Sequence, residues 1–205
     1  EMKAIGQALI EKLEEGYFIG KDKNQLVTNS AADKTQKFLF EIEPDNKGKS
    51  YLIETVLIRE EGRNTVCVST QVGCNVGCEF CATGKMGFLK NLSAAEIVSQ
   101  VYQVKKLSGE EITNIVFMGM GEPFLNYNSM LKSLKILTHP KGMDLSSKRI
   151  TVSTVGFVDK IKKFADDLNP IYNGIFSHIY THPDVQSKIA DGKFVNQYKK
   201  ELWTE

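Results

Sequence analysis

Residues 112–123 read Ile-Thr-Asn-Ile-Val-Phe-Met-Gly-Met-Gly-Glu-Pro, an apolar run that ends in a glycine-rich turn. An apolar run of this length, bounded by turn residues, predicts a strand buried inside a sheet. The residues before it predict a helix to about Leu107, because Ser93-Ala-Ala-Glu96 is a capping box. The residues after it predict an amphipathic helix over 127–137.

The alternation of strand and helix continues beyond this run. It predicts a strand over 149–154, a helix over 158–166 and a fourth strand over 171–175. Strands that alternate with helices predict parallel β/α units with right-handed crossovers. The fold class is therefore α/β, with about three β/α units in a partial barrel or an open sheet. We expect the loops after these strands to converge, because the chemistry of a parallel barrel lies at the carboxyl ends of its strands.

A different pattern precedes the β/α units. Residues 3–15 predict a small helix, and a β-rich stretch follows with predicted strands over 37–42, 51–58 and 65–69. These strands predict a small β-meander. We therefore divide the chain into an amino-terminal helix and meander at 1–63, a β/α part at 64–176 and an unassigned tail at 177–205.

All four cysteines lie close together in the sequence, at Cys67, Cys74, Cys78 and Cys81. The last three form a C-x3-C-x2-C run, whose soft thiolates suit a 4Fe–4S cluster. Three protein ligands leave one iron open, and that iron could bind the amino and carboxylate groups of S-adenosylmethionine (SAM). The alternative is a zinc site that takes Cys67 as its fourth ligand.

The composition is that of an ordinary globular protein, with 41% hydrophobic and 25% charged residues. Lys and Arg number 26 against 25 for Asp and Glu, so a nucleic-acid partner requires a local basic patch. No stretch approaches the roughly 20 apolar residues of a membrane span, and no signal sequence is evident. Clustered thiols without an export signal predict a cytoplasmic protein.

Three segments together resemble one known family. They are Cys67 to Phe88, Met118-Gly-Met-Gly-Glu-Pro123 and Ile150-Thr-Val-Ser-Thr154, and they resemble the radical SAM RNA methyltransferases of the RlmN/Cfr type. The resemblance extends from about Phe38 to Asp167. It implies a partial radical SAM (β/α) barrel and a SAM-dependent enzyme. The RlmN branch methylates carbon-2 of adenosine in 23S rRNA and in tRNA, whereas the Cfr branch methylates carbon-8.

The resemblance also implies roles for particular residues. Cys74, Cys78 and Cys81 match the ligands of the 4Fe–4S cluster. Gly121 and Glu122 match the segment that holds the amino group of SAM, an ammonium for which a carboxylate and carbonyl oxygens are suitable partners. Ser153 matches a further SAM contact, although a strand-end serine also commonly satisfies backbone groups. Phe80 either shields the adenine of SAM or packs in the core.

Two residues outside the cysteine run match catalytic positions of the family. Glu54 matches the proton acceptor, and Cys67 matches the cysteine that resolves a covalent protein–RNA adduct. That role requires an accessible, electropositive setting for the thiol. Without the resemblance, Glu54 would be an outward-facing strand residue and Cys67 an inert strand cysteine.

The partners that the resemblance implies are 23S rRNA, tRNA and an electron donor such as flavodoxin, with no membrane. Four basic residues flank the predicted catalytic loops and are candidates for phosphate contacts. They are Lys85, Lys90, Lys148 and Arg149. Each is also compatible with an ordinary solvated surface position.

The sequence departs from the family in its second half. The family uses a further cysteine near its carboxyl terminus as methyl carrier, and no cysteine follows Cys81. The Ser-Leu-His segment of the family has only weak candidates, Ser177-His178 and His182-Pro183. We therefore expect a truncated or divergent member that binds a cluster and SAM without methylating RNA by the family's route. The alternatives are a non-catalytic zinc module, a degenerate fragment, or another radical SAM reaction.

Overall fold

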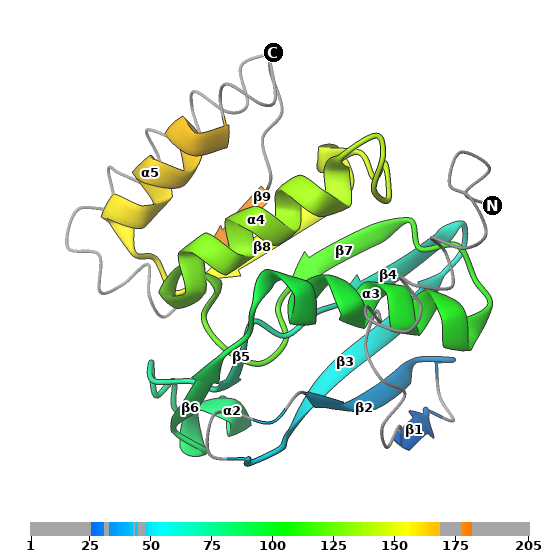
Figure 1. Cartoon of the computed structure of the whole chain (residues 1–205), viewed down its shortest axis with the longest axis horizontal. Helices are drawn as coiled ribbons and strands as arrows, with labels where there is room; N and C mark the ends of the chain where they lie inside the picture. The colour runs from blue at the N-terminus through cyan, green and yellow to red at the C-terminus, as the bar shows by residue number, and fades with distance from the viewer. Residues whose placement is uncertain (1–25, 31–32, 43, 45–47, 169–177, 182–205) are drawn as a thin grey trace, which may run out of the picture.

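A computed structural model gives the structure of the protein, and it describes residues 26–30, 33–42, 44, 48–168 and 178–181. Seven strands form one mixed sheet in the order β1-β2-β3-β4-β7-β8-β9 (Figure 1). Their bounds are β1 Leu26–Asn29, β2 Gln36–Ile42, β3 Tyr51–Glu60, β4 Arg63–Cys67, β7 Asn114–Phe117, β8 Ile150–Thr154 and β9 His178–Thr181. The first four strands pair antiparallel, whereas β4, β7, β8 and β9 pair parallel.

Three helices connect the parallel strands. They are α3 (Ala94–Ser108), α4 (Tyr127–Thr138) and α5 (Val158–Leu168), and α3 and α4 lie against the same face of the sheet (Figure 1). Short 3-10 helices precede α4 and β8, at η1 (Pro123–Asn126) and η2 (Ser147–Arg149). The α/β class predicted from the sequence is confirmed by this arrangement.

The capping box predicted at the start of α3 is present. The Ser93 side chain accepts a hydrogen bond from the backbone N–H of Glu96, and the Glu96 carboxylate accepts one from the N–H of Ser93. The helix ends at Gly109, which has a left-handed φ of 70° that suits glycine. These two signals position the helix so that its apolar stripe packs on the sheet and on α4.

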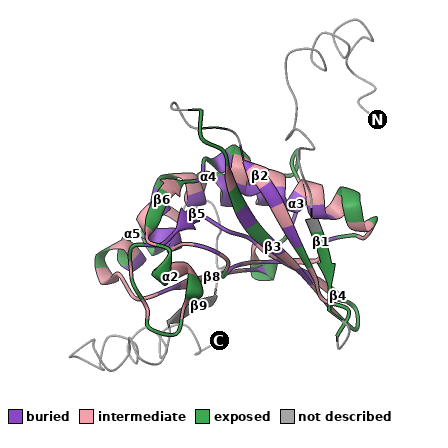
Figure 2. Cartoon of the chain, turned by 90° about the horizontal axis from the view of Figure 1, so that it is seen from below, coloured by how far each residue is buried: buried purple, intermediate pink, exposed green. Residues whose placement is uncertain are grey.

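The two faces of the sheet differ in their burial. Along β3, Ile53, Thr55 and Leu57 are buried, whereas Leu52 and Glu54 are exposed, an alternation that Figure 2 shows in its colours. The buried residues join the core beneath the helices. Neighbouring residues in register share a face, so the pairings extend these two faces across the whole sheet. The face opposite the core is the one that carries Glu54.

A second, two-stranded sheet lies beside the carboxyl end of β4, and the sequence did not predict it. It consists of β5 (Gln71–Gly73) and β6 (Phe88–Asn91), with the short helix α2 (Ala82–Lys85) between them. The three cysteines of the C-x3-C-x2-C run lie in the connection from β5 to β6. The small sheet therefore forms the base from which the cysteine loop extends.

Several predictions fall on residues that the structure does not describe. The helix predicted over 3–15 and the strand predicted over 171–175 lie outside the described residues. Beyond β8, on the side away from β7, the next strand of the sheet is β9, which lies in the segment assigned to the tail. The curvature of a partial barrel and the division at residues 63/64 and 176/177 stay predictions. Of the helices in the described ranges, none is long and apolar enough to cross a membrane.

Candidate functional site

The cysteine loop is closed at its base by backbone contacts. The N–H of Cys74 donates to the carbonyl of Gly87, with 3.1 Å between N and O. A Cβ added at Gly73 would lie 1.8 Å from that same carbonyl oxygen, so only glycine fits there. Within the loop, the N–H of Cys81 donates to the carbonyl of Cys78. The fold thus holds the two ends of the loop together.

The three thiols of the loop lie within electrostatic reach of one another. Burial raises the pKa of the Cys74 thiol, and the negative charges of Glu122, Cys78 and Cys81 raise it further, although a backbone hydrogen bond from Val76 lowers it. Thiolates that repel one another are stabilised by a shared Lewis acid, and soft sulfur donors suit iron. The donor set therefore fits an iron–sulfur cluster.

The sulfur atoms are not arranged as a finished ligand set. Among the described residues, no three His, Cys, Asp or Glu side chains are grouped closely enough to hold a metal ion. This finding applies equally to the cluster and to the alternative zinc site with Cys67. Cys67 is at the end of β4, before the loop begins, and Cys74 is the most buried of the three loop cysteines.

Glu122 lies at the carboxyl end of β7, where the sequence predicted a contact to the amino group of SAM. Its carboxylate accepts hydrogen bonds from the N–H of Phe124 (2.9 Å), the hydroxyl of Thr154 (2.8 Å) and the N–H of Val155 (2.9 Å). The residue is 3% exposed, and burial raises the pKa of its carboxyl group. A carboxylate offers about four acceptor positions, so these three bonds leave capacity for one more donor.

The turn that contains Glu122 contacts the start of the cysteine loop directly. The carbonyl of Met120 accepts hydrogen bonds from the N–H groups of Thr70 and Gln71. Gly121 has a φ of 97°, and a Cβ added there would lie 2.5 Å from the side chain of Gln71. The Gln71 amide oxygen in turn accepts from the N–H of Glu122. The predicted SAM segment and the predicted cluster loop are therefore side by side.

Ser153 and Cys67 lie on the same face of the sheet. Cys67 pairs with Val116 of β7, and Val116 pairs with Thr151 of β8, two residues before Ser153. Ser153 is half-buried, whereas its neighbour Thr154 points to the opposite, buried side and binds Glu122. The structure thus adds Thr154 to the site, a residue that was not predicted from the sequence.

Glu54 and Cys67 also share that face. Val56 pairs with Cys67, and Glu54 is two residues from Val56 on the same side of β3. The Glu54 side chain is 48% exposed and forms an ion pair with Lys37, with 3.0 Å between Nζ and Oε1. Burial raises the pKa of the Cys67 thiol to about 11, although a backbone hydrogen bond from Met118 partly lowers it. The setting of Cys67 therefore favours the neutral thiol rather than the thiolate.

Phe80 lies in the cysteine loop and is 65% exposed, so it does not pack in the core of the described structure. Other large apolar residues of the same region are also exposed, namely Met86, Phe88 and Leu89. The apolar side chain of Phe80 thus remains accessible to a ligand or partner beside the cysteines.

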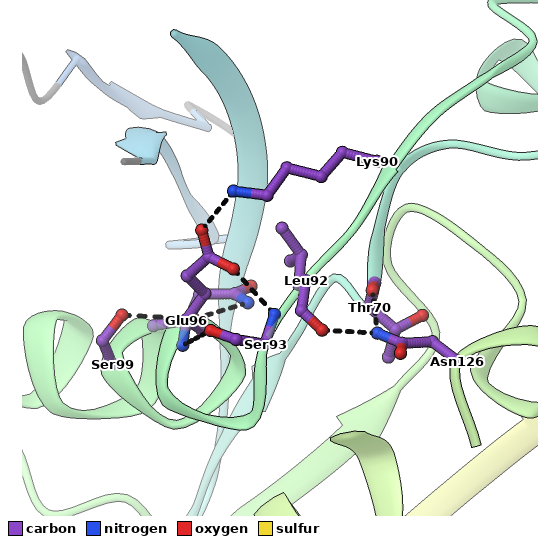
Figure 3. A network of polar contacts seen from close by, with 8 residues as sticks. Thr70, Lys90, Leu92, Ser93, Glu96, Ser99 and Asn126 are labelled. Carbon is purple, nitrogen blue, oxygen red and sulfur yellow. Dashed lines mark hydrogen bonds and ion pairs between the residues drawn. The ribbon is translucent and has the colours of Figure 1, made fainter. Parts of the chain in front are cut away.

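The basic residues predicted to meet phosphates are in different environments. Lys85, Lys148 and Arg149 are exposed. The Lys90 ammonium forms an ion pair with Glu96, with 2.7 Å between Nζ and Oε1 (Figure 3). The same Glu96 carboxylate accepts the capping hydrogen bond from the N–H of Ser93 at the start of α3. Lys90 therefore has a structural role at the start of α3 that the sequence did not reveal.

Three buried polar residues of the site were missed in the sequence, Ser69, Gln100 and Asn126. Asn126 donates from its amide nitrogen to the carbonyls of Thr70 (2.8 Å) and Leu92 (2.6 Å), which ties the end of the small sheet away from the cysteine loop to η1 (Figure 3). Gln100 gave a weak signal, because it interrupts the apolar stripe of the helix that begins at Ser93. Partners so distant in sequence could not be read from the pattern alone.

Comparison with known protein families matches residues 68–183 to the Radical SAM superfamily. The match includes the cysteine loop, the turn at Gly121 and Glu122, and Ser153, and it covers more than half of the chain. The chain therefore belongs to the radical SAM superfamily. Glu54 and Cys67 precede the matched segment.

Within that superfamily, the chain is similar to proteins named RlmN. It is 50% identical over 149 residues to a "Probable dual-specificity RNA methyltransferase RlmN" of Fervidobacterium nodosum, covering 73% of this chain and 41% of the relative. It is 45% identical over 181 residues to the protein of the same name from Bacillus velezensis, covering 87% of this chain and 48% of the relative. The chain thus spans less than half the length of these relatives.

A solved structure agrees with this similarity. The crystal structure of a radical SAM methyltransferase from Sphaerobacter thermophilus has a TM-score of 0.65 and 40% sequence identity. The match covers 79% of this chain and 47% of that chain. The fold described above is therefore shared with a radical SAM methyltransferase.

Proposed function

We propose that this chain carries the cofactor-binding half of a radical SAM RNA adenine methyltransferase. The observation that carries the proposal is the contact between two parts of the chain that the sequence keeps apart. The turn at Met120 to Glu122 is hydrogen-bonded to Thr70 and Gln71, at the entry to the cysteine loop. A cluster on the loop and SAM on the turn would then be neighbours.

Each predicted site residue has a place in this proposal. Cys74, Cys78 and Cys81 hold a 4Fe–4S cluster, and Gly121, Glu122 and Ser153 hold SAM, with Phe80 beside the adenine. When bound, the cluster supplies the electron that cleaves the sulfonium of SAM. Glu122 contributes an oriented carboxylate, because three protein donors fix its position before SAM arrives.

The chemistry on RNA is assigned to the face of the sheet that lies opposite the helix-covered core and also carries Ser153. There Glu54 is the proposed proton acceptor and Cys67 the thiol that resolves a protein–RNA adduct. Glu54 is exposed and forms an ion pair with Lys37, so its carboxylate is reachable from solvent. The half-buried Cys67 retains its proton at neutral pH, so it must lose that proton to act as a nucleophile.

The substrates proposed are 23S rRNA and tRNA, methylated at carbon-2 of adenosine. The similarity to proteins named dual-specificity RNA methyltransferases supports an RNA substrate. The exposed Lys85, Lys148 and Arg149 are proposed to contact phosphates. Electrons would come from a donor such as flavodoxin, in the cytoplasm. We also propose that the mixed sheet is one side of a partial radical SAM barrel, a fold that the solved relative supports.

Cysteine variants test the cofactor assignment. After anaerobic reconstitution, the wild-type chain should contain about four iron and four sulfide, and Cys67→Ala should contain the same. Cys74→Ala and Cys81→Ala should lose most of the iron. With dithionite and SAM, the wild type and Cys67→Ala should release 5′-deoxyadenosine, and the loop variants should not.

The alternative zinc site gives the opposite pattern. It would bind about one zinc without sulfide, and Cys67→Ala would lose that metal. The proposed function would be contradicted by a wild-type chain that holds zinc without sulfide. It would also be contradicted by a chain that carries a cluster and leaves SAM intact.

A further inference from the structure

The amide side chain of Gln100 is buried beneath the carboxyl end of β4 and uses its polar atoms fully. The residue is 1% exposed. Its oxygen accepts hydrogen bonds from the N–H of Ser69 and the hydroxyl of Thr55, both at 2.8 Å. Its nitrogen donates to the carbonyls of Ser69 (2.9 Å) and Glu96 (3.2 Å). Gln100 therefore holds both backbone polar groups of Ser69.

Ser69 extends this contact to two parts of the proposed site. Its hydroxyl donates to the carbonyl of Glu54 at 2.6 Å and accepts from the N–H of Met120 at 2.9 Å. A Cβ added at Gly119 would lie 2.8 Å from the Ser69 hydroxyl oxygen, so glycine permits this approach. One buried hydroxyl thus joins β3 at Glu54 to the turn that contains Gly121 and Glu122.

The position of Gln100 is unusual for a polar residue. Its neighbours on the buried face of α3 are Ile97, Val101 and Val104, all apolar. A fully satisfied buried network contributes little net stability compared with an apolar core, but it fixes one geometry because any displacement leaves polar groups unpaired. The four bonds of Gln100 reach Thr55 in the middle of β3, Ser69 just after β4 and Glu96 in the first turn of α3. Their effect is to fix the relative position of those segments.

We propose that Gln100 is the positioning residue of the site, acting through Ser69 to set the spacing between Glu54, the entry to the cysteine loop and the SAM-binding turn. It touches no substrate or cofactor itself. The part of the inference that concerns SAM rests on the proposed function. The part that concerns the local order of residues 68–71 and 118–122 does not.

The test compares Gln100→Met with Val104→Ala in the full chain. Methionine keeps the approximate volume of glutamine and removes all four hydrogen bonds. Val104 lies one turn further along α3, is equally buried and takes part in none of these hydrogen bonds. Val104→Ala therefore controls for a weakened core. Hydrogen exchange resolved by mass spectrometry should accelerate about tenfold in 68–71 and 118–122 for Gln100→Met, and not for Val104→Ala.

SAM affinity is the second readout, measured on the cluster-loaded chain by equilibrium dialysis. Gln100→Met should raise the Kd for SAM about tenfold, whereas Val104→Ala should leave it unchanged. If Gln100→Met does not fold, Ser69→Ala takes its place as the test variant. It removes one hydroxyl and keeps the hydrogen bonds between the Ser69 backbone and Gln100. It should accelerate exchange at 118–122 in particular.

Two results separate the inference from the proposed function. If the wild type binds no SAM, the proposed function fails, and the exchange pattern still decides whether Gln100 orders the strand ends. If Gln100→Met and Val104→Ala lose stability alike, with equal exchange at 68–71 and 118–122, Gln100 is an ordinary core residue and the inference is overturned. Unchanged exchange at 118–122 in Ser69→Ala overturns it equally.

Discussion

Cys67 shows how position within a strand sets the chemistry of a side chain. It is the last residue of β4, and burial raises the pKa of its thiol from 9.0 to about 11. The neutral thiol is therefore the resting form at pH 7. A role as the resolving nucleophile requires a base, and Glu54 lies on the same face of the sheet.

Alkylation of Cys67 measures this raised pKa. In the native chain, the rate of its reaction with iodoacetamide, followed on the peptide by mass spectrometry, should rise with pH to a midpoint near 11. The same cysteine in denaturant is the control, and its midpoint should return to the ordinary value near 9.0. A native midpoint at or below the denatured one would show that the thiol is activated instead of suppressed.

Residue types in the site could be read from the sequence, but their hydrogen bonds could not. The spacing of Cys74, Cys78 and Cys81 predicts a soft metal-binding loop, because these candidate ligands are close together in the sequence. Gln100 and Ser69 are 31 residues apart, and nothing in either neighbourhood indicates that they meet. Ser153 was named from the family resemblance, and the contact of Thr154 with Glu122 could not be predicted, because adjacent strand residues point to opposite faces and the sequence does not say which face is buried.

Helices α4 and α5 are joined by a polar contact between Tyr127 and Asp167. The Tyr127 hydroxyl donates to Asp167 at 2.6 Å, and the Lys163 ammonium binds the same carboxylate oxygen at 2.6 Å. Burial, followed by the bond to Asp167, raises the pKa of Tyr127 above its ordinary value of 10.0. Bonds to Lys163 and Tyr127 lower the pKa of Asp167. The contact holds α5 beside the helix that covers the sheet.

Replacement of Tyr127 by phenylalanine tests this contact. Because folding raises the pKa of Tyr127, its stabilising effect is complete below pH 10 and is lost as the pH rises beyond that value. Tyr127→Phe should therefore lower Tm by a few degrees at pH 7, and the difference from the wild type should shrink above pH 10. Tyr102→Phe controls for a lost hydroxyl elsewhere. A difference that grows with alkaline pH would refute the assigned contact.

Elements with strong local signals agree well with their prediction. The capping box at Ser93 marked the start of α3, and the apolar run at 112–118 contains β7. The strands β5 and β6 were missed because each is short and their pairing spans the whole cysteine loop. Such a pair depends on contacts distant in sequence, which periodicity does not report.

At the scale of the whole molecule, the meander and the β/α units share one sheet and one core. Strand β4 pairs with β3 on one side and with β7 on the other. Phe38 and Leu57 from the meander are fully buried in the same cluster as Ile115 and Phe117 of β7. The predicted boundary at residue 63/64 falls within β4, at a point where the sheet is continuous.

A chain shortened to residues 64–205 should therefore fail to fold by itself. It would lose the β3 partner of β4 and expose the apolar core that Phe38 and Leu57 cover. Circular dichroism and size-exclusion chromatography should show loss of the cooperative unfolding transition and aggregation, with the full chain as control. A monomeric fragment that unfolds cooperatively would show that the meander is a separable domain.

The backbone closure between Cys74 and Gly87 has a thermodynamic consequence for metal capture. An open chain must lose conformational entropy to bring three distant ligands together, and that cost grows with the length between them. Here the ends of the loop are already joined, so most of this cost is met during folding. After one sulfur binds iron, the other two act at a high effective concentration. If the loop holds the proposed cluster, this closure would favour recapture of a single detached sulfur before the metal departs.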